Sequence, residues 1–169
     1  MVGYFLYTIV KTKKPKTILE IGFGSGFSSF FMSEASKEAE IISLEKEITR
    51  FDKGKDIIKK FNKNNIKLVG IDFFEFIKEN QTVFDLVFID GAKARYIDYI
   101  KEIEKYLNKD SIVIADNIYL RNRINRDDLK RSEKRMVKKM AEFSKYIYEN
   151  FETIILDIGD GISISFKVS

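Results

Sequence analysis

Short runs of β-branched and other apolar residues alternate with longer amphipathic runs along most of the chain. The short runs predict strands at Thr17–Gly22, Glu40–Glu45, Ile66–Gly70, Val83–Asp90, Ser111–Asp116, Glu152–Asp157 and Ile162–Val168. The longer runs predict helices at Phe27–Lys37, Glu47–Asn62, Phe73–Glu79, Ala94–Leu107 and Asp128–Asn150. Regular alternation of strand and helix predicts a single α/β domain over residues 1–169, with helices on both faces of a mostly parallel sheet.

The composition of individual strands predicts their place in the sheet. Residues 83–89 and 112–115 are almost continuously apolar, as expected of central strands that are buried on both faces. The last two predicted strands are separated by a short segment that contains Gly159-Asp160-Gly161, a typical turn sequence. We therefore expect them to form an antiparallel hairpin at the edge of the sheet.

The apolar segment Met1–Val10 is too short to span a membrane, and its positive charges follow it, unlike those of a signal peptide. We expect no membrane association. The 169 residues include no Cys and no His, which excludes disulfides, thiolate nucleophiles, Ser–His triads and the usual zinc sites. The absence of Cys also suits a reducing cytoplasm, where we expect the protein to be located.

Positive charge is concentrated in one part of the chain. The net charge is +4, but residues 121–145 hold ten Lys and Arg against four acids. A solvated helix face is the simplest interpretation, and nucleic-acid binding becomes attractive if that face borders an active site. Within this region, Arg121–Asp128 shows neither helical nor strand periodicity, and we predict a flexible loop beside the sheet.

A glycine-rich segment, Glu20-Ile-Gly-Phe-Gly-Ser-Gly26, joins the first predicted strand to the first predicted helix. Such a loop lets the backbone approach a nucleotide-like ligand at a helix N-terminus. Its third glycine comes one residue earlier than in dinucleotide-binding folds, and it lacks Lys and Arg to neutralise a diphosphate. Glu45 could accept hydrogen bonds from two ribose hydroxyls, while Glu20 and Asp90 could face the amino group of S-adenosylmethionine. A tight turn without ligand is the alternative.

Oxygen-bearing side chains follow two further predicted strands, Asp90 after one and Asp116-Asn117 after the other. If these strands are neighbours, the three side chains meet at the carboxyl edge of the sheet, where two carboxylates and an amide would suit Mg²⁺. Lys93 is three residues from Asp90 and could take a proton from a coordinated hydroxyl. Ordinary turn and surface roles are the alternatives, and Tyr96 and Tyr99 are expected to pack in the core.

Taken together, these motifs resemble the metal-dependent class I O-methyltransferases, which include catechol and caffeoyl-CoA O-methyltransferases and bacterial enzymes that methylate 5-hydroxyuridine in tRNA. The resemblance runs from about Val2 to Val168, and its most specific carriers are Asp90, Lys93 and the Asp116-Asn117 pair. It implies a Rossmann-like fold of seven strands with an antiparallel last strand. It also implies Mg²⁺-dependent methyl transfer from S-adenosylmethionine to a hydroxyl of a catechol-like acceptor, or alternatively of tRNA.

The resemblance also assigns residue roles. Lys93 would be the catalytic residue, and Asp90, Asp116 and Asn117 would hold the metal. The cofactor would contact the glycine loop and three neighbouring strand ends, through Glu20, Gly22, Phe23, Gly24, Gly26, Ser28, Glu45, Asp72, Phe73 and Asp90. Within this set, Glu45 would bind the ribose and Asp72 and Phe73 would flank the adenine.

Two departures from the family pattern affect the expected acceptor. Most of the family's N-terminal helices have no counterpart in this sequence, so we expect an open acceptor pocket or one completed by a second subunit. The apolar residues of Met1–Val10 could form such a homodimer contact. The segment after Asn117 is basic, which disfavours a plant phenol. A binding module without turnover and, more weakly, a dehydrogenase remain alternative functions.

Overall fold

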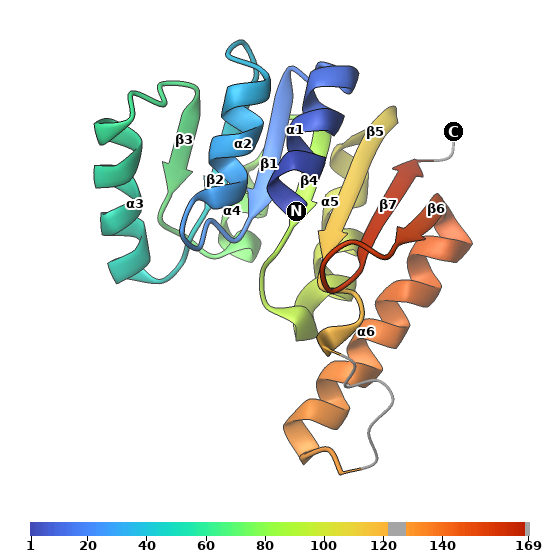
Figure 1. The fold of residues 1–169 in the computed structure, drawn as a ribbon. Helices are drawn as coiled ribbons and strands as arrows, with labels where there is room; N and C mark the ends of the chain where they lie inside the picture. Colours follow the sequence, from blue (N-terminus) through green and yellow to red (C-terminus); the bar gives the residue numbers. More distant parts are fainter. Residues whose placement is uncertain (122–127, 168–169) are drawn as a thin grey trace.

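A computed structural model describes residues 1–121 and 128–167, whose strands form one seven-stranded sheet in the order β3-β2-β1-β4-β5-β7-β6 (Figure 1). The strands are β1 Thr17–Ile21, β2 Glu40–Leu44, β3 Ile66–Val69, β4 Phe84–Ile89, β5 Leu107–Asp116, β6 Phe151–Leu156 and β7 Ile162–Lys167. The first five strands pair in parallel, whereas β7 is antiparallel to both of its neighbours, β5 and β6. The predicted edge hairpin and antiparallel last strand are confirmed.

Strands β4 and β5 lie side by side at the centre of the sheet, as their apolar composition predicts. Ile89 is paired with Ala115 in the parallel register, so the next residues, Asp90 and Asp116, leave the two strands at the same level. Strand β1 borders the other side of β4. This order brings the glycine loop and both aspartates to the carboxyl edge of the sheet.

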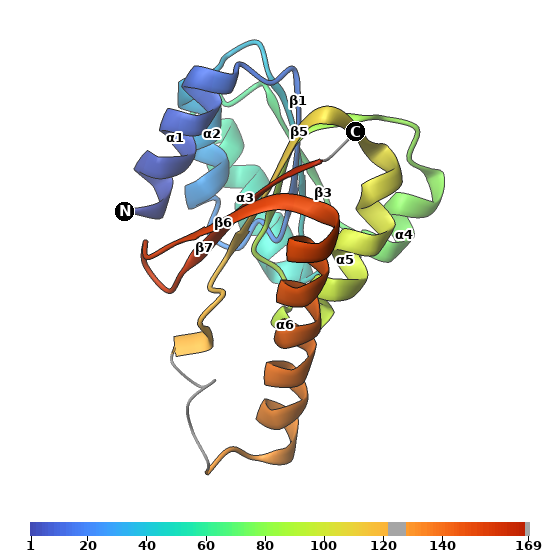
Figure 2. The ribbon, with the colours of Figure 1, turned by 90° about the vertical axis from the view of Figure 1, so that its right-hand side faces the viewer.

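Helices cover both faces of the sheet (Figure 2). Apolar residues of α1 Val2–Lys13, α2 Phe27–Ala35 and α3 Ile48–Lys60 pack in the core of one face, and those of α4 Phe73–Glu79, α5 Tyr96–Ile103 and α6 Arg131–Asn150 in the core of the other. Leu86 and Phe88 of β4 face the first core, while Val87 and Ile89 face the second. Both faces of this central strand are therefore apolar, which explains its continuous run of hydrophobic residues.

The N-terminal segment, for which no helix was predicted, forms helix α1. Its Leu6 and Val10, two of the apolar residues considered for a homodimer contact, are fully buried against the chain's own sheet. Tyr4 stays exposed and contacts the ring of Phe31, with 5.0 Å between ring centroids. A homodimer contact through this helix stays a prediction.

Several predicted boundaries also differ. Strand β5 begins at Leu107 instead of Ser111, so the preceding helix α5 ends earlier, at Ile103, and is followed by a 3₁₀ turn. Helix α6 begins at Arg131, where the N-cap backbone of Lys130 donates a hydrogen bond to Glu133. The loop predicted at 121–128 lies for its greater part, residues 122–127, outside the described residues. No helix within the described ranges is long and apolar enough to cross a membrane.

Candidate active site

A cavity of about 460 Å³ lies at the carboxyl edge of the sheet, between the glycine loop and the loops that follow β2, β3 and β4. Its wall includes nine of the residues predicted for the cofactor or the metal: Gly22, Phe23, Gly24, Ser28, Glu45, Asp72, Phe73, Asp90 and Asp116. These residues are spread over almost one hundred positions of the chain. The fold therefore gathers most of the predicted site into one space.

The glycine loop needs glycine at position 22 because of its backbone conformation. Gly22 has φ +103°, and a Cβ at this position would lie 2.6 Å from the carbonyl oxygen of Asp90. The loop can therefore pass close to the end of β4 only if residue 22 has no side chain. Gly26 has φ +78° at the start of α2 and serves the turn, although it is not part of the cavity wall.

Glu20 is buried beneath the loop and does not reach the wall of the cavity. Its carboxylate accepts hydrogen bonds from the hydroxyls of Ser28, Ser29 and Ser43, the last at 2.6 Å. Burial raises the pKa of Glu20 from 4.5 to about 7, although these hydrogen bonds oppose the change. Direct contact with the cofactor stays a prediction, while the structure shows Glu20 fixing Ser28, which does line the cavity.

Two further acids tie strand ends to the segments that follow them. The Glu45 carboxylate accepts one hydrogen bond from the backbone N–H of Gly24 and another from that of Glu47, each at 3.0 Å. Asp72 accepts a hydrogen bond from the N–H of Phe74 and thereby caps helix α4. Both acids line the cavity on the side of the glycine loop that is remote from Asp116, as a nucleoside site would require.

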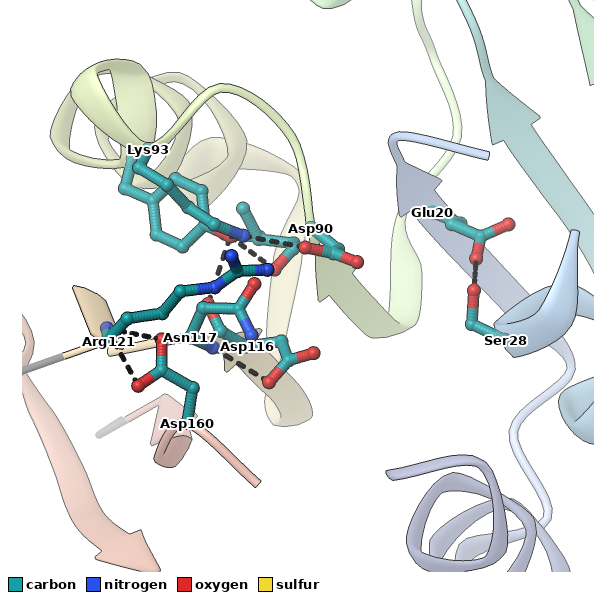
Figure 3. Close-up of polar contacts among 10 residues, drawn as sticks. Glu20, Ser28, Asp90, Lys93, Asp116, Asn117, Arg121 and Asp160 are labelled. Atoms are coloured by element: carbon teal, nitrogen blue, oxygen red, sulfur yellow. Dashed lines mark hydrogen bonds and ion pairs between the residues drawn. The ribbon is translucent and has the colours of Figure 1, made fainter. Parts of the chain in front are cut away.

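Asp90, Asp116 and Asn117 gather at the ends of β4 and β5, apart from the Glu20–Ser28 pair (Figure 3). Burial raises the pKa of Asp116, and the negative charge of Asp90 adds to the effect. Two carboxylates and an amide are hard oxygen donors that fit Mg²⁺. Within the described ranges, this site included, no three Asp, Glu, His or Cys side chains are grouped as a metal would need, so the third donor here would have to be the amide of Asn117.

Lys93 lies beside these acids and is held by two oxygen atoms. Its Nζ donates hydrogen bonds to Oδ1 of Asp90 at 2.6 Å and to the hydroxyl of Tyr96 at 2.7 Å (Figure 3). The lysine side chain is 20% exposed, so it remains accessible from the solvent. Lys93 is not itself part of the cavity wall, so its catalytic role and the surface-lysine alternative both stay predictions.

The segment after Asn117 is held by the turn between β6 and β7. Asp160 accepts hydrogen bonds from the backbone N–H of Arg121 at 2.8 and 2.7 Å to its two carboxylate oxygens. The N–H of Ile118 donates to the carbonyl of Gly161 at 3.0 Å. Asn117 itself has φ +60°, an uncommon conformation for a residue other than glycine. The turn thus holds the backbone next to Asn117, the predicted third oxygen donor.

Neither Tyr96 nor Asp160 was predicted to belong to the site. Tyr96 was expected to be part of the core, and its ring is indeed fully buried, but its hydroxyl contacts Lys93. Helical spacing predicts which face of a helix a tyrosine occupies, but it does not predict the hydrogen-bond partners of the tyrosine hydroxyl. Asp160 was assigned only to a turn. The Gly-Asp-Gly sequence around it predicts a turn, but it does not indicate a contact with Arg121, which is 39 positions away.

Fold and site together define a class: an α/β protein whose glycine loop and acidic strand ends form a nucleoside-type pocket at the carboxyl edge of the sheet. Comparison with known proteins makes this more specific. The model of a family described as O-methyltransferase matches residues 2–168. The chain therefore belongs to the O-methyltransferase family, and the predicted class, an S-adenosylmethionine-dependent O-methyltransferase, is confirmed.

Relatives and solved structures agree with this assignment. Caffeoyl-CoA O-methyltransferase 1 of Arabidopsis thaliana is 22% identical over 184 residues, covering 99% of this chain and 70% of the relative. Catechol O-methyltransferase of Niastella koreensis is 28% identical over 127 residues, which are 69% of this chain and 55% of that protein. The crystal structure of a Bacillus cereus O-methyltransferase in complex with S-adenosylhomocysteine has a TM-score of 0.87 at 20% identity, with 99% of this chain and 80% of the other covered. The predicted Rossmann-like fold is thereby confirmed.

Proposed function

We propose that the protein transfers a methyl group from S-adenosylmethionine to a hydroxyl of a small acceptor with two adjacent oxygens, in a reaction that depends on Mg²⁺. The observation that carries this proposal is the shared cavity. Glu45 and the glycine loop, which suit a nucleoside, line the same space as Asp90 and Asp116, which suit a cation. Donor and acceptor could therefore meet within one site.

On the donor side, the residues of this chain bind and orient the cofactor. Glu45 is 6% exposed and already holds the loop through Gly24, so its carboxylate is in a fixed position to accept ribose hydroxyls. Asp72 and Phe73 would border the adenine. The loop backbone at Gly22 and the hydroxyl of Ser28 would border the methionine portion, with the sulfonium methyl directed towards Asp90 and Asp116.

On the acceptor side, Asp90, Asp116 and Asn117 would hold the cation, whose positive charge lowers the pKa of a nearby acceptor hydroxyl. Lys93 would receive the hydroxyl proton. The acceptor oxygen forms its bond to the methyl carbon as the carbon–sulfur bond breaks, and sulfur keeps the electron pair, which gives S-adenosylhomocysteine. The chain contributes orientation and electrostatic stabilisation, because the reacting groups approach in fixed positions.

The test is methylation of catechol by purified protein with labelled S-adenosylmethionine, with Mg²⁺ and with EDTA. We expect turnover only with Mg²⁺, and a loss of roughly a hundredfold or more in Asp90→Asn and Asp116→Asn. Asp110→Asn is the matched control, because Asp110 is an exposed aspartate near the opposite end of β5. Equal turnover in EDTA, or a fully active Asp116→Asn variant, would contradict the metal mechanism.

A hydroxylated base in tRNA is the second candidate acceptor. The observation that favours it is helix α6, whose N-terminal half projects beyond the carboxyl edge of the sheet (Figures 1 and 2). That half carries exposed basic side chains at Arg131, Lys134, Arg135 and Lys138. They could contact phosphates while a base enters the cavity.

Salt dependence distinguishes the two acceptors. If RNA is bound, the logarithm of its affinity should fall linearly with the logarithm of the salt concentration, by about 0.7 for each phosphate neutralised on a single strand. Exchange of Lys134, Arg135 and Lys138 for Gln should weaken tRNA binding and reduce the slope. A variant with Lys55, Lys59 and Lys60 of α3 exchanged for Gln serves as control. A flat salt response would exclude the tRNA candidate.

A further inference from the structure

Tyr96 occupies a buried position between the two strands that carry the acidic site residues. It is the first residue of α5, its side chain is fully buried, and its ring contacts that of Phe143 edge-on, with 5.5 Å between centroids. Its hydroxyl lies 3.0 Å from the carbonyl oxygen of Ile89 and 3.1 Å from that of Asp116. One phenol oxygen therefore contacts the ends of both β4 and β5.

The hydrogen bonds at this oxygen fix its chemical role. A tyrosine hydroxyl has one proton to donate, and its oxygen can also accept. The proton goes to one of the two carbonyls, and the oxygen accepts from Nζ of Lys93 at 2.7 Å.

Lys93 depends on this arrangement for its direction. Its two hydrogen-bond acceptors are Oδ1 of Asp90 and the hydroxyl of Tyr96. Asp90 is on the cavity wall and its side chain is 38% exposed, so it can change partners when ligands bind. Tyr96 is buried and its hydroxyl contacts two backbone carbonyls, so it keeps its position and orients the Lys93 amine.

The geometry points to Tyr96 as a positioning residue of methyl transfer: its hydroxyl holds the Lys93 amine beside Asp90 and links the ends of β4 and β5. This inference rests on the proposed function for its effect on turnover, though not for the contact itself. A residue that only filled the core would need the ring and not the hydroxyl. The two roles can therefore be separated by removing one oxygen atom.

Tyr96→Phe removes that atom and keeps the ring. We expect kcat to fall roughly tenfold to a hundredfold, as when a hydrogen bond to a charged group is lost, while the KM for S-adenosylmethionine changes by less than about twofold. The loss should be much smaller when Lys93→Met is already present, because the hydroxyl acts through that amine. Tyr106→Phe is the control, since the Tyr106 hydroxyl also donates to a backbone carbonyl, that of Ile77 at 3.1 Å, away from the cavity.

A second readout does not require turnover. Lysines of the free protein are methylated reductively, and peptide mass spectrometry follows the rate at each lysine. Lys93 should react roughly fivefold faster in Tyr96→Phe than in the parent protein, because its amine has lost a hydrogen-bond partner. Lys55 serves as an internal reference. If catechol is not methylated at all, the proposed function fails, while this measurement still tests the contact.

Three outcomes would overturn the inference. They are a kcat for Tyr96→Phe equal to that of Tyr106→Phe, an effect that adds fully to that of Lys93→Met, and an unchanged rate of Lys93 modification. If Phe at position 96 lowers the thermal midpoint below the assay temperature, 4-fluorophenylalanine at that position fills the space of the hydroxyl without donating a hydrogen bond. The same comparisons then apply to that protein.

Discussion

The buried carboxyl group of Glu20 should give the folded protein a pH dependence that one isosteric substitution removes. Glu20 lies in β1 beneath the glycine loop, and burial raises its pKa from 4.5 to about 7. Its hydrogen bonds from three serine hydroxyls reduce this effect without cancelling it. Folding therefore favours the protonated acid over the carboxylate.

The sign and the size of the effect follow from this difference. Because the folded protein binds the proton more tightly than the unfolded chain, the contribution to stability is complete below about pH 4.5 and is lost as the pH rises through about 7. At about 1.4 kcal/mol for each pH unit between the two pKa values, the loss amounts to about 3 kcal/mol. Above about pH 7 no further change is expected from this group.

Glu20→Gln keeps the shape and stays neutral, so its free energy of unfolding should lack this contribution. Urea unfolding followed by circular dichroism between about pH 5 and about pH 8 measures both proteins. As the pH rises, we expect the free energy of unfolding of the variant to increase by up to about 3 kcal/mol relative to that of the unmodified chain. Glu40→Gln, at an exposed glutamate on β2, should show no such trend. A difference between Glu20→Gln and the unmodified chain that is constant over this range would refute the reasoning.

Three further predictions concern the loop, the cofactor site and the core. Gly22→Ala should lower the free energy of unfolding by about 2 kcal/mol or more in urea titrations, because its Cβ would lie 2.6 Å from a backbone oxygen. Gly24→Ala, where nothing lies within 4 Å, should cost only about 1 kcal/mol, and equal losses would contradict the close approach. Glu45→Gln should weaken binding of S-adenosylmethionine by about tenfold in calorimetry, and an unchanged Kd would remove its ribose role. Phe143→Ala should destabilise the protein by about 3 to 5 kcal/mol, against less than about 0.5 kcal/mol for the exposed Tyr148→Ala, as thermal unfolding would show.

Much of the fold could be predicted because its central strands are buried on both faces. The apolar runs that became β4 and β5 identified the middle of the sheet, and their parallel pairing placed Asp90 and Asp116 together. Helix α1 could not be predicted in the same way. Its seven apolar and aromatic side chains leave no clear polar face, since the helix packs on the sheet and on α2 while Tyr4 remains exposed.

The placement of the candidate residues could be predicted where backbone topology decides it, but not where side-chain direction does. Strand ends bring acids to one edge whatever their rotamers, and Glu45, Asp90 and Asp116 do line one cavity there. Glu20 belongs to the same loop motif, but its carboxylate turns towards serines of α2 and β2. Only the packing of three elements decides that direction. The contact between Tyr96 and Lys93 likewise depends on how a 3₁₀ turn leads into α5.

The hydrogen bonds between the Asp160 carboxylate and the backbone N–H of Arg121 also bear on the order in which the protein folds during synthesis. They join backbone and side chain across 39 positions of the chain. While the ribosome is still extending α6, the Asp160 carboxylate that accepts from the backbone N–H of Arg121 has not yet been synthesised, even if β1 to β5 have already paired. Under the proposed function, the nucleoside side of the cavity would then form before the acceptor side, and catalytic competence would be acquired only when β7 inserts between β5 and β6.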